Sequence, residues 1–247
     1  MTWSEEFDGP AGAPPDPSVW VAEVGGGGWG DAQEQTYTRP PANASLTGRG
    51  ELAIVARAEA DGGVSSARLT TRGRVAFRYG VIAARMKVPA GAGVWPAFWL
   101  LGTDIGEVGW PGCGEIDVME HVGADPYSVH GTVHGPGYAG VGSGIGSRHV
   151  TPSLLSDRFR TYAVEWKPDE VSWSVDGHEY FRVTPDDIPG PWLFNRPFFL
   201  LINLAIGGAW PGNEAVASTL PAELLVDWIR VVGSEISYSK PSPRGYP

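Results

Sequence analysis

Three acidic residues stand close together in the otherwise apolar segment 112–123, GCGEIDVMEHVG. Because side chains alternate along a strand, Glu115 and Asp117 share one face and Glu120 would point to the other. One extra residue, a β-bulge at 118–119, would return Glu120 to the face of the first two. We therefore expect a bulged strand that carries all three carboxylates on one face and apolar residues on the other.

Carboxylates arranged in this way could hydrolyse a glycosidic bond. With the bulge, the Cα atoms of Glu115 and Glu120 are roughly 13 Å apart, at about 3.3 Å per residue. On a concave sheet their side chains could lean together toward the separation of about 5–5.5 Å that retaining glycosidases need. Three carboxyls this close cannot all ionise, so at least one pKa must rise and supply a proton donor. A solvated acidic face and a calcium site are the alternatives, although calcium loops favour Gly-rich turns over strands.

Length and composition favour a single globular domain. The chain has 247 residues, of which 42% are hydrophobic and 19% charged, and all-β sandwiches often reach this length as one domain. The formal net charge of −10 argues against a nucleic acid partner and weighs against a heavily sulfated polysaccharide. The only cysteine, Cys113, excludes an intrachain disulfide and is expected to pack as a small residue rather than act as a nucleophile.

Membrane and export signals are not predicted in this chain. No apolar run approaches the roughly 18 residues that span a bilayer, so no membrane partner is expected. The first residues, MTWSEEFDG, lack a basic and apolar leader, so no signal peptide is predicted. A mature domain restarted at Met1 would have the same appearance.

Short strands separated by Gly and Pro turns are predicted along the chain. The expected strand regions are 51–59, 73–89, 160–184, 196–208 and 224–232. Expected loops are 25–30 and 140–147, and residues from about 240 to 247 are an expected tail. Asp176-Gly177 predicts a hairpin turn, and 196–208 is apolar enough for a strand buried on both faces. Without an internal repeat or linker, this pattern predicts an all-β sandwich or jelly roll over residues 1–247.

The segment EIDVMEH resembles the active-site signature of glycoside hydrolase family 16, in its E-x-D-x-x-E form. That form occurs in endo-1,3-β-glucanases (laminarinases), agarases and carrageenases. Further blocks that resemble the family are WSEEFDG (3–9), residues 79–102, HGTVHG (130–135), INLAIGGAWPG (202–212) and VDWIRVV (226–232). The combination is most similar to the bacterial laminarinases. The resemblance implies a concanavalin A-like β-jelly roll with an open cleft across its concave face.

The resemblance also implies roles for the three acids in retaining hydrolysis. Glu115 would be the nucleophile that forms a glycosyl-enzyme, and Glu120 would be the general acid and then the general base. Asp117 would hydrogen-bond Glu115 and help to keep the two pKa values apart. No cofactor is expected for this chemistry.

Other residues fall in blocks that resemble the family's substrate cleft. The expected sugar-contacting residues are Trp95, Trp99, Trp110, His134, Trp210, Arg85 and Asn43. A Trp ring offers a flat apolar plate and one N–H donor to the face of a sugar. By contrast, Trp166, Trp173 and Trp228 lie in strand patterns and are expected to be structural. Asp31 stands where the family usually has Asn after Trp-Gly, so no role is carried over to it.

Many members of this family bind one structural Ca²⁺ on the convex side, far from the cleft. The matching positions in this sequence are Glu6, Gly50 (through its carbonyl) and Asp227. Oxygen ligands suit calcium, which would tie the first and last strands together. A zinc site built from His121, His130 and His134 is disfavoured, because their spacing matches no metal motif.

The expected function is therefore endo-acting hydrolysis of β-1,3-glucan, with laminarin-like chains and possible mixed-linkage β-1,3-1,4-glucan as substrates. An agarase or other galactan hydrolase would carry the same signature. A non-catalytic β-glucan-binding protein is the alternative of another class, but such proteins tend to lack the two glutamates. We expect a monomer whose only partner is the polysaccharide. We also expect a secreted bacterial protein, because a polymeric glucan cannot enter the cell.

Overall fold

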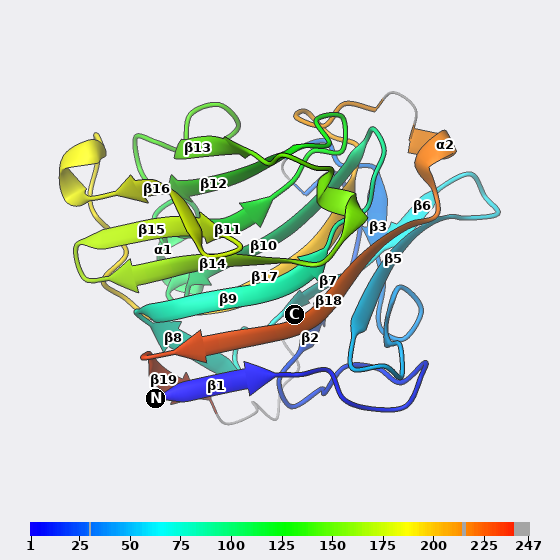
Figure 1. Ribbon diagram of the computed structural model, residues 1–247, viewed down its shortest axis with the longest axis horizontal. Coiled ribbons are helices and arrows are strands. Elements are labelled where there is room, and N and C mark those ends of the chain that lie inside the picture. Colours follow the sequence, from blue (N-terminus) through cyan, green and yellow to red (C-terminus); the bar gives the residue numbers. More distant parts are fainter. Residues whose placement is uncertain (30, 214–215, 240–247) are drawn as a thin grey trace.

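Two stacked β-sheets make up the fold, as the alternating apolar pattern predicted (Figure 1). This computed structural model describes residues 1–29, 31–213 and 216–239, so the predicted tail from about 240 lies outside the described residues. We call one sheet the back sheet and the other, which carries the three acids, the cleft sheet. The all-β jelly-roll prediction is confirmed.

Hydrogen bonds join the strands of each sheet in a defined order. The back sheet runs through β16 (His178–Val183), β15 (Glu170–Val175), β14 (Arg160–Lys167), β9 (Gly80–Lys87), β18 (Ala222–Val232), β5 (Leu52–Ala58), β6 (Val64–Ser66) and β3 (Gln35–Tyr37), with β1 (Thr2–Glu5) beside β18 and β4 (Ala44–Leu46) beside β5. The cleft sheet runs through β13 (Ile145–Val150), β12 (Ser128–His134), β11 (Glu115–Glu120), β10 (Val94–Gly102), β17 (Phe198–Ile206), β7 (Arg68–Thr70) and β2 (Val21–Glu23), with β8 (Val75–Arg78) beside β17 and β19 (Glu235–Tyr238) beside β8.

Helical segments are short. They are α1 (Ile105–Val108), α2 (Val216–Thr219) and the 3-10 turns η1 (Leu155–Asp157) and η2 (Pro185–Asp187). Within the described ranges, none of them has the length and apolar character to cross a membrane.

The core lies between the two sheets. All nine residues of β17 are buried, as expected for the apolar segment 196–208. Trp166 and Trp173 are also buried, and their indole N–H groups donate to backbone carbonyls of Phe194 at 2.7 Å and Asp117 at 2.7 Å. Because Trp173 belongs to the back sheet and Asp117 to β11, this bond fixes β11 to the layer behind it. Both tryptophans are thus structural, as predicted.

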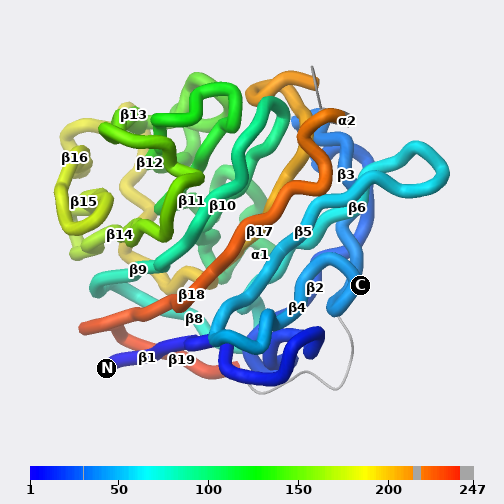
Figure 2. Tube along the Cα trace, turned by 45° about the vertical axis from the view of Figure 1, so that its right-hand side comes forward, coloured from blue at the N-terminus to red at the C-terminus, as the bar shows by residue number. Residues whose placement is uncertain are grey.

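One predicted strand region, 73–89, divides between the two sheets. Tyr79 and Gly80 have left-handed φ angles of 65° and 96°, which end β8 in the cleft sheet and start β9 in the back sheet. A Cβ at position 80 would lie 2.5 Å from the Val232 carbonyl oxygen, so this crossing needs glycine. In Figure 2, β9, β18 and β5 run side by side across the back sheet.

The turn at 176–177 was predicted correctly, and the loop at 140–147 only in part. Asp176 and Gly177 both have positive φ, 50° and 79°, and join β15 to β16 in the predicted hairpin. The predicted loop 140–147 is only partly a loop, because β13 begins at Ile145. That strand alternates between half-buried and exposed residues, and it has no apolar periodicity from which a strand could be predicted.

Candidate active site

The predicted bulge is present in β11 and orients the three acids. In the pairing with β10, Asp117 and Met119 have partners and Val118 between them does not. The register with β12 shifts at the same place. Glu115, Asp117 and Glu120 consequently line one hollow, whereas the side chains of Val118 and Met119 are buried in the core. The bulge prediction is confirmed.

Each of the two glutamates on β11 accepts a hydrogen bond from one indole N–H. Trp110 Nε1 donates to Glu115 Oε2 at 2.8 Å, and Trp95 Nε1 donates to Glu120 Oε1 at 3.0 Å. Trp95 is 8% exposed, whereas Trp110 is 48% exposed. A donor held against a carboxylate stabilises its charged form. The Trp95 bond is therefore largely shielded from water, and the Trp110 bond is open to it.

Asp117 and His134 lie together beside Glu115. His134 Nε2 is 3.2 Å from Asp117 Oδ2 and 3.8 Å from Glu115 Oε1. Asp117 is only 2% exposed, and its charge raises the pKa of the neighbouring Glu115. Two carboxyls placed this way do not both ionise readily.

Burial and crowding raise the pKa of all three acids. The pKa of Glu115 is raised well above its usual value, mainly by burial and next by the charge of Asp117. The pKa of Asp117 is raised for the same first reason, with the charge of Glu120 second. Burial and then the charge of Glu115 raise the pKa of Glu120 to about 7. The three acids together therefore retain protons near neutral pH, so an ionised nucleophile and a protonated acid can coexist in one site.

Two hollows meet over these acids and form one cleft. A hollow of about 540 Å³ extends past His130 and Trp210, and another of about 310 Å³ extends past Trp29 and Trp99. The residues that line both hollows are Asp31, Trp95, Trp110, Glu115 and Glu120. The acids thus lie in the middle of the cleft, with open space on either side.

Aromatic rings line both arms of the cleft. In one arm, Trp210 meets Trp95 edge to face at 5.5 Å and His130 at 4.8 Å between ring centroids. In the other, Arg68 lies over both Trp99, at 4.7 Å, and Trp29, at 4.9 Å. All four tryptophans expected in the cleft, and His134, are there; their contact with sugar stays a prediction.

Sequence reasoning missed several residues of this cleft. They are Trp29, Asp31, Arg68, His130 and Asn203. The Gly-rich loop before Trp29 and the exchange of Asn for Asp31 were the available signals. Arg68 gave no such signal, because the sequence does not show on which face of a short strand a single arginine lies.

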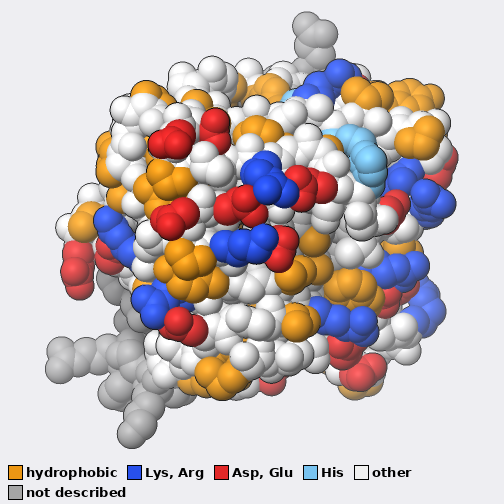
Figure 3. Space-filling model, turned by 60° about the vertical axis from the view of Figure 1, so that its left-hand side comes forward, with side chains coloured by type: hydrophobic (Ala, Val, Ile, Leu, Met, Phe, Trp, Pro, Cys, Tyr) orange, Lys and Arg blue, Asp and Glu red, His pale blue; other side chains and the backbone are white. Residues whose placement is uncertain are grey.

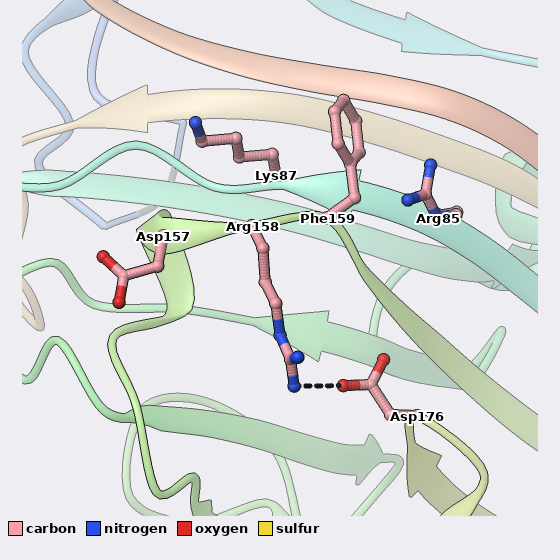
Figure 4. Close-up of a pocket in the computed structure, with 6 residues that line it drawn as sticks. All are labelled: Arg85, Lys87, Asp157, Arg158, Phe159 and Asp176. Carbon is pink, nitrogen blue, oxygen red and sulfur yellow. Dashed lines mark ion pairs between the residues drawn. The ribbon is translucent and has the colours of Figure 1, made fainter.

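Arg85 lies outside the cleft, so its predicted sugar contact is wrong. It sits on β9 in the back sheet, forms an ion pair with Asp227 and lies 4.8 Å over the ring of Phe159. Figure 4 shows Phe159 between Arg85 and Lys87 in a shallow hollow on that side. The chain crosses between the sheets from β9 to β10, so the neighbouring block 94–102 reaches the cleft and Arg85 does not.

Asn43 is likewise not a sugar-contacting residue. It is 3% exposed, and its side-chain amide donates to the Val55 carbonyl at 2.8 Å and to Ser65 Oγ at 2.9 Å. Its carbonyl oxygen accepts from Thr38 at 2.6 Å. With both N–H groups and the oxygen engaged, Asn43 fixes the β3–β4 region instead.

The calcium positions come together only in part. β18 pairs with β5 up to Val226 and with β1 from Ile229, so Asp227 lies where the three strands meet. The Glu6 carboxylate is paired with Arg230 at 2.9 Å, and Asp227 is paired with Arg85. These carboxylates therefore fit a cation only if they leave their arginines.

One backbone oxygen and one carboxylate oxygen lie near Gly50. A Cβ at Gly50, whose φ is 76°, would lie 3.8 Å from the Glu6 carbonyl oxygen and 3.7 Å from Asp8 Oδ1. Carbonyl and carboxylate oxygens are the ligands that calcium prefers. The calcium site stays a prediction.

Two other candidates for chemistry are structural. His121 is buried, and its Nδ1 is 2.9 Å from the Ser128 carbonyl oxygen, so it does not join the cleft histidines. Burial raises the pKa of the Cys113 thiol to about 11, which keeps it protonated. A protonated thiol is a poor nucleophile.

Comparison with known proteins identifies the family. The profile of glycosyl hydrolases family 16 matches residues 32–230. The chain is 42% identical over 243 residues to a β-glucanase of Rhodothermus marinus, covering 94% of this chain and 84% of that protein. It is 34% identical over 260 residues to glucan endo-1,3-β-glucosidase A1 of Niallia circulans, covering 94% of this chain and 37% of that longer protein. The laminarinase catalytic domain of Thermotoga maritima matches with a TM-score of 0.86 and 41% identity over 97% of this chain and 98% of that one. The chain therefore belongs to glycosyl hydrolase family 16.

Proposed function

We propose that this protein is a retaining endo-hydrolase of β-1,3-glucan. The position of the acids supports this most directly, because Glu115 and Glu120 lie where the two hollows meet. A polysaccharide can pass through both arms and be cut within the chain. The relatives named β-glucanase, endo-1,3-β-glucosidase and laminarinase support the same substrate class.

The reaction would proceed in two displacements. The Glu115 carboxylate attacks the anomeric carbon, and the bond to the leaving sugar breaks as Glu120 donates its proton to that oxygen. Glu120, now ionised, removes a proton from water, which attacks the anomeric carbon and releases Glu115. His134 lies within 3.8 Å of both Asp117 and Glu115, and together with Asp117 it orients the Glu115 carboxyl. The residues of the cleft need no cofactor for these steps.

Laminarin provides the first test. The wild-type protein should lower the viscosity of laminarin solutions faster than it releases reducing ends, and NMR should show β-anomer products before mutarotation. Glu115→Gln and Glu120→Gln should each reduce kcat by at least about 10³-fold. An α-anomer as first product would contradict the nucleophile, and release of single terminal sugars would contradict endo cleavage.

Other polysaccharides distinguish the alternatives. Mixed-linkage glucan should be cut more slowly than laminarin, and agarose and κ-carrageenan should not be cut. On the face shown in Figure 3, basic and acidic side chains are interspersed and form no continuous basic patch for a sulfated polymer. If only a galactan were cleaved, the proposed substrate would be wrong and the proposed catalytic residues would stand. Binding of laminarin without any cleavage would indicate a non-catalytic glucan-binding protein.

We further propose that one Ca²⁺ binds near Gly50, with Glu6, Asp8 and Asp227 as neighbours. The closeness of the Glu6 carbonyl and the Asp8 carboxylate to Gly50 supports this. EDTA should lower the Tm of a calcium-loaded sample, and added Ca²⁺ should restore it. An unchanged Tm in EDTA would contradict the site. We also propose that the protein acts outside the cell as a monomer, to be checked by fractionation of the native host and by light scattering.

A further inference from the structure

Asp31 occupies a fixed place at the centre of the cleft. It lies between β2 and β3 and lines both hollows together with Glu115 and Glu120. Its backbone N–H donates to the Gly28 carbonyl at 2.9 Å, and its carbonyl accepts from the Ala209 N–H at 2.8 Å. These bonds tie the loop to the segment that follows β17.

The backbone around Asp31 is strained. Trp29 and Ala32 have φ angles of 48° and 56°, in the left-handed region that residues with a Cβ rarely adopt. Such strain persists only where the surrounding structure imposes it, and it concentrates at functional sites. The surrounding structure therefore imposes the backbone conformation of Trp29 and Ala32, on either side of Asp31.

The Asp31 carboxylate differs from the other three acids of the cleft in its partners. Glu115 receives the N–H of Trp110, Glu120 receives that of Trp95, and Asp117 lies against His134. Over residues 1–29, 31–213 and 216–239, no side chain or backbone N–H donates to the Asp31 carboxylate. Asp31 thus adds a half-buried carboxylate to the cleft that accepts no hydrogen bond from the described residues.

Titratable groups face Glu120 from several elements. They are Glu115 and Asp117 on β11, His130 and His134 on β12, Arg148 on β13, Arg68 on β7, Tyr180 on β16 and Asp31 in its loop. Both arginines are already paired, Arg148 with Asp125 at 2.5 Å and Arg68 with Glu23. Asp31 is therefore the acid that faces Glu120 from outside β11 without an arginine or lysine partner in the described part of the chain.

Electrostatic coupling agrees with this geometry. Burial and the charge of Glu115 are the larger causes of the raised pKa of Glu120, and the charge of Asp31 adds to them. Partial burial also raises the pKa of Asp31 itself, against the opposing effect of His134. Glu115 loses its charge when it forms the glycosyl-enzyme, whereas Asp31 takes no part in that bond.

We propose that Asp31 is a positioning residue for the general acid: its negative charge favours the state in which Glu120 holds its proton and extends hydrolysis toward alkaline pH. This inference rests on the proposed function of Glu120. It assigns a role to the aspartate that stands in this chain where the family usually has asparagine.

Asp31→Asn tests the inference, because it removes the charge and keeps the size. The kcat/KM for a laminarin oligosaccharide should be measured across pH, since its limbs report the acid and base of the free enzyme. We expect the alkaline limb to move about 0.3–1 pH unit lower, with the acid limb unchanged. At alkaline pH this is roughly a 2- to 10-fold loss in kcat/KM. Asp31→Glu should restore the limb.

A matched control removes one negative charge elsewhere. Asp186 is exposed in η2, so Asp186→Asn should reproduce the wild-type profile. An Asp31→Asn profile that superposes on the wild type, or an equal loss at every pH, would overturn the proposed role. Equal Tm values for the wild type and Asp31→Asn would show that the fold is kept.

A measurement without turnover separates this inference from the function. If the wild type cuts no glucan at any pH, the proposed function fails, and the coupling can still be tested by NMR. With ¹³C-labelled glutamate carboxyls, Glu120 is assigned from the signal lost in Glu120→Gln and then titrated in the wild type and in Asp31→Asn. A lower pKa for Glu120 in Asp31→Asn would support the role, and an unchanged pKa would refute it.

Discussion

The two indole hydrogen bonds to Glu115 and Glu120 should affect opposite limbs of the pH profile of kcat/KM. Trp95→Phe removes the N–H at 3.0 Å from Glu120, and Trp110→Phe removes the N–H at 2.8 Å from Glu115. Each donor stabilises a charged carboxylate, so its loss raises the pKa of that residue. Glu120 must be protonated in the first step, so Trp95→Phe should move the alkaline limb of kcat/KM upward. Glu115 must be ionised, so Trp110→Phe should move the acid limb upward.

The two shifts should differ in size because the two tryptophans differ in exposure. A hydrogen bond to a charged group contributes about 1.5–3 kcal/mol and one to a neutral group about 1 kcal/mol. In the shielded Trp95 bond, a difference of about 1.4 kcal/mol corresponds to about one pH unit. The alkaline limb should then move from near the Glu120 pKa of about 7 to about 8. Trp110 is 48% exposed, so water replaces most of its N–H, and we expect only about 0.3 pH unit.

The assay is kcat/KM for laminarin oligosaccharides between pH 4 and 10, about the range in which Asp to Lys side chains titrate. Trp192→Phe is the control, because its N–H donates to the Pro168 carbonyl at 2.7 Å and neither residue lines the cleft. Its profile should match the wild type. A Trp95→Phe enzyme whose acid limb moves while its alkaline limb stays fixed would refute the assignment of Glu120 as the acid.

Further predictions concern stability and the residues outside the cleft. Glu120→Gln removes a carboxyl whose pKa is raised in the folded protein. Keeping this group in the fold costs more stability as pH rises, so the Tm of the variant should exceed that of the wild type by more at about pH 8 than at about pH 5. Asn43→Ala should lower the free energy of unfolding by about 1–3 kcal/mol in urea titrations, with kcat/KM within about 2-fold of wild type once folded. Arg85→Ala should leave kcat/KM unchanged, because Arg85 pairs with Asp227 outside the cleft. A lower kcat/KM would instead support the predicted contact between Arg85 and sugar. Gly131→Ala should greatly lower the Tm, because its Cβ would overlap the Trp173 ring, whereas Gly106→Ala in α1 should leave the Tm equal or slightly higher.

The bulge in β11 was predictable because this strand carries three carboxylates among apolar residues. Carboxylates within an apolar strand require a common polar face, and only a bulge provides one for Glu115, Asp117 and Glu120. Strand β17 was equally clear, since its nine buried residues form one continuous apolar run. In both strands the order of polar and apolar residues alone indicates which side chains are buried, so no knowledge of the neighbouring strands is needed.

Arg85 and Asn43 show where this reasoning stops. Alternation tells which residues of a strand share a face, but it does not tell which sheet the strand joins. Tyr79 and Gly80 send β9 to the back sheet, and Arg85 goes with it. A polar residue such as Asn43 looks the same in sequence whether it bonds to sugar or to its own backbone. Asp31 was missed because its proposed role depends on Glu120, which is distant in the sequence.

The place of β18 has a consequence for synthesis. This strand joins β9 to β5 in the middle of the back sheet and also carries β1 at one end. During translation, every other strand of the back sheet leaves the ribosome before residues 222–232 do. Until then, β9 and β5 each present an unpaired edge, which is a template for pairing with other chains. The nascent chain thus passes through a late stage in which its back sheet exists as two open halves, and chaperones that cover strand edges should matter most at that stage.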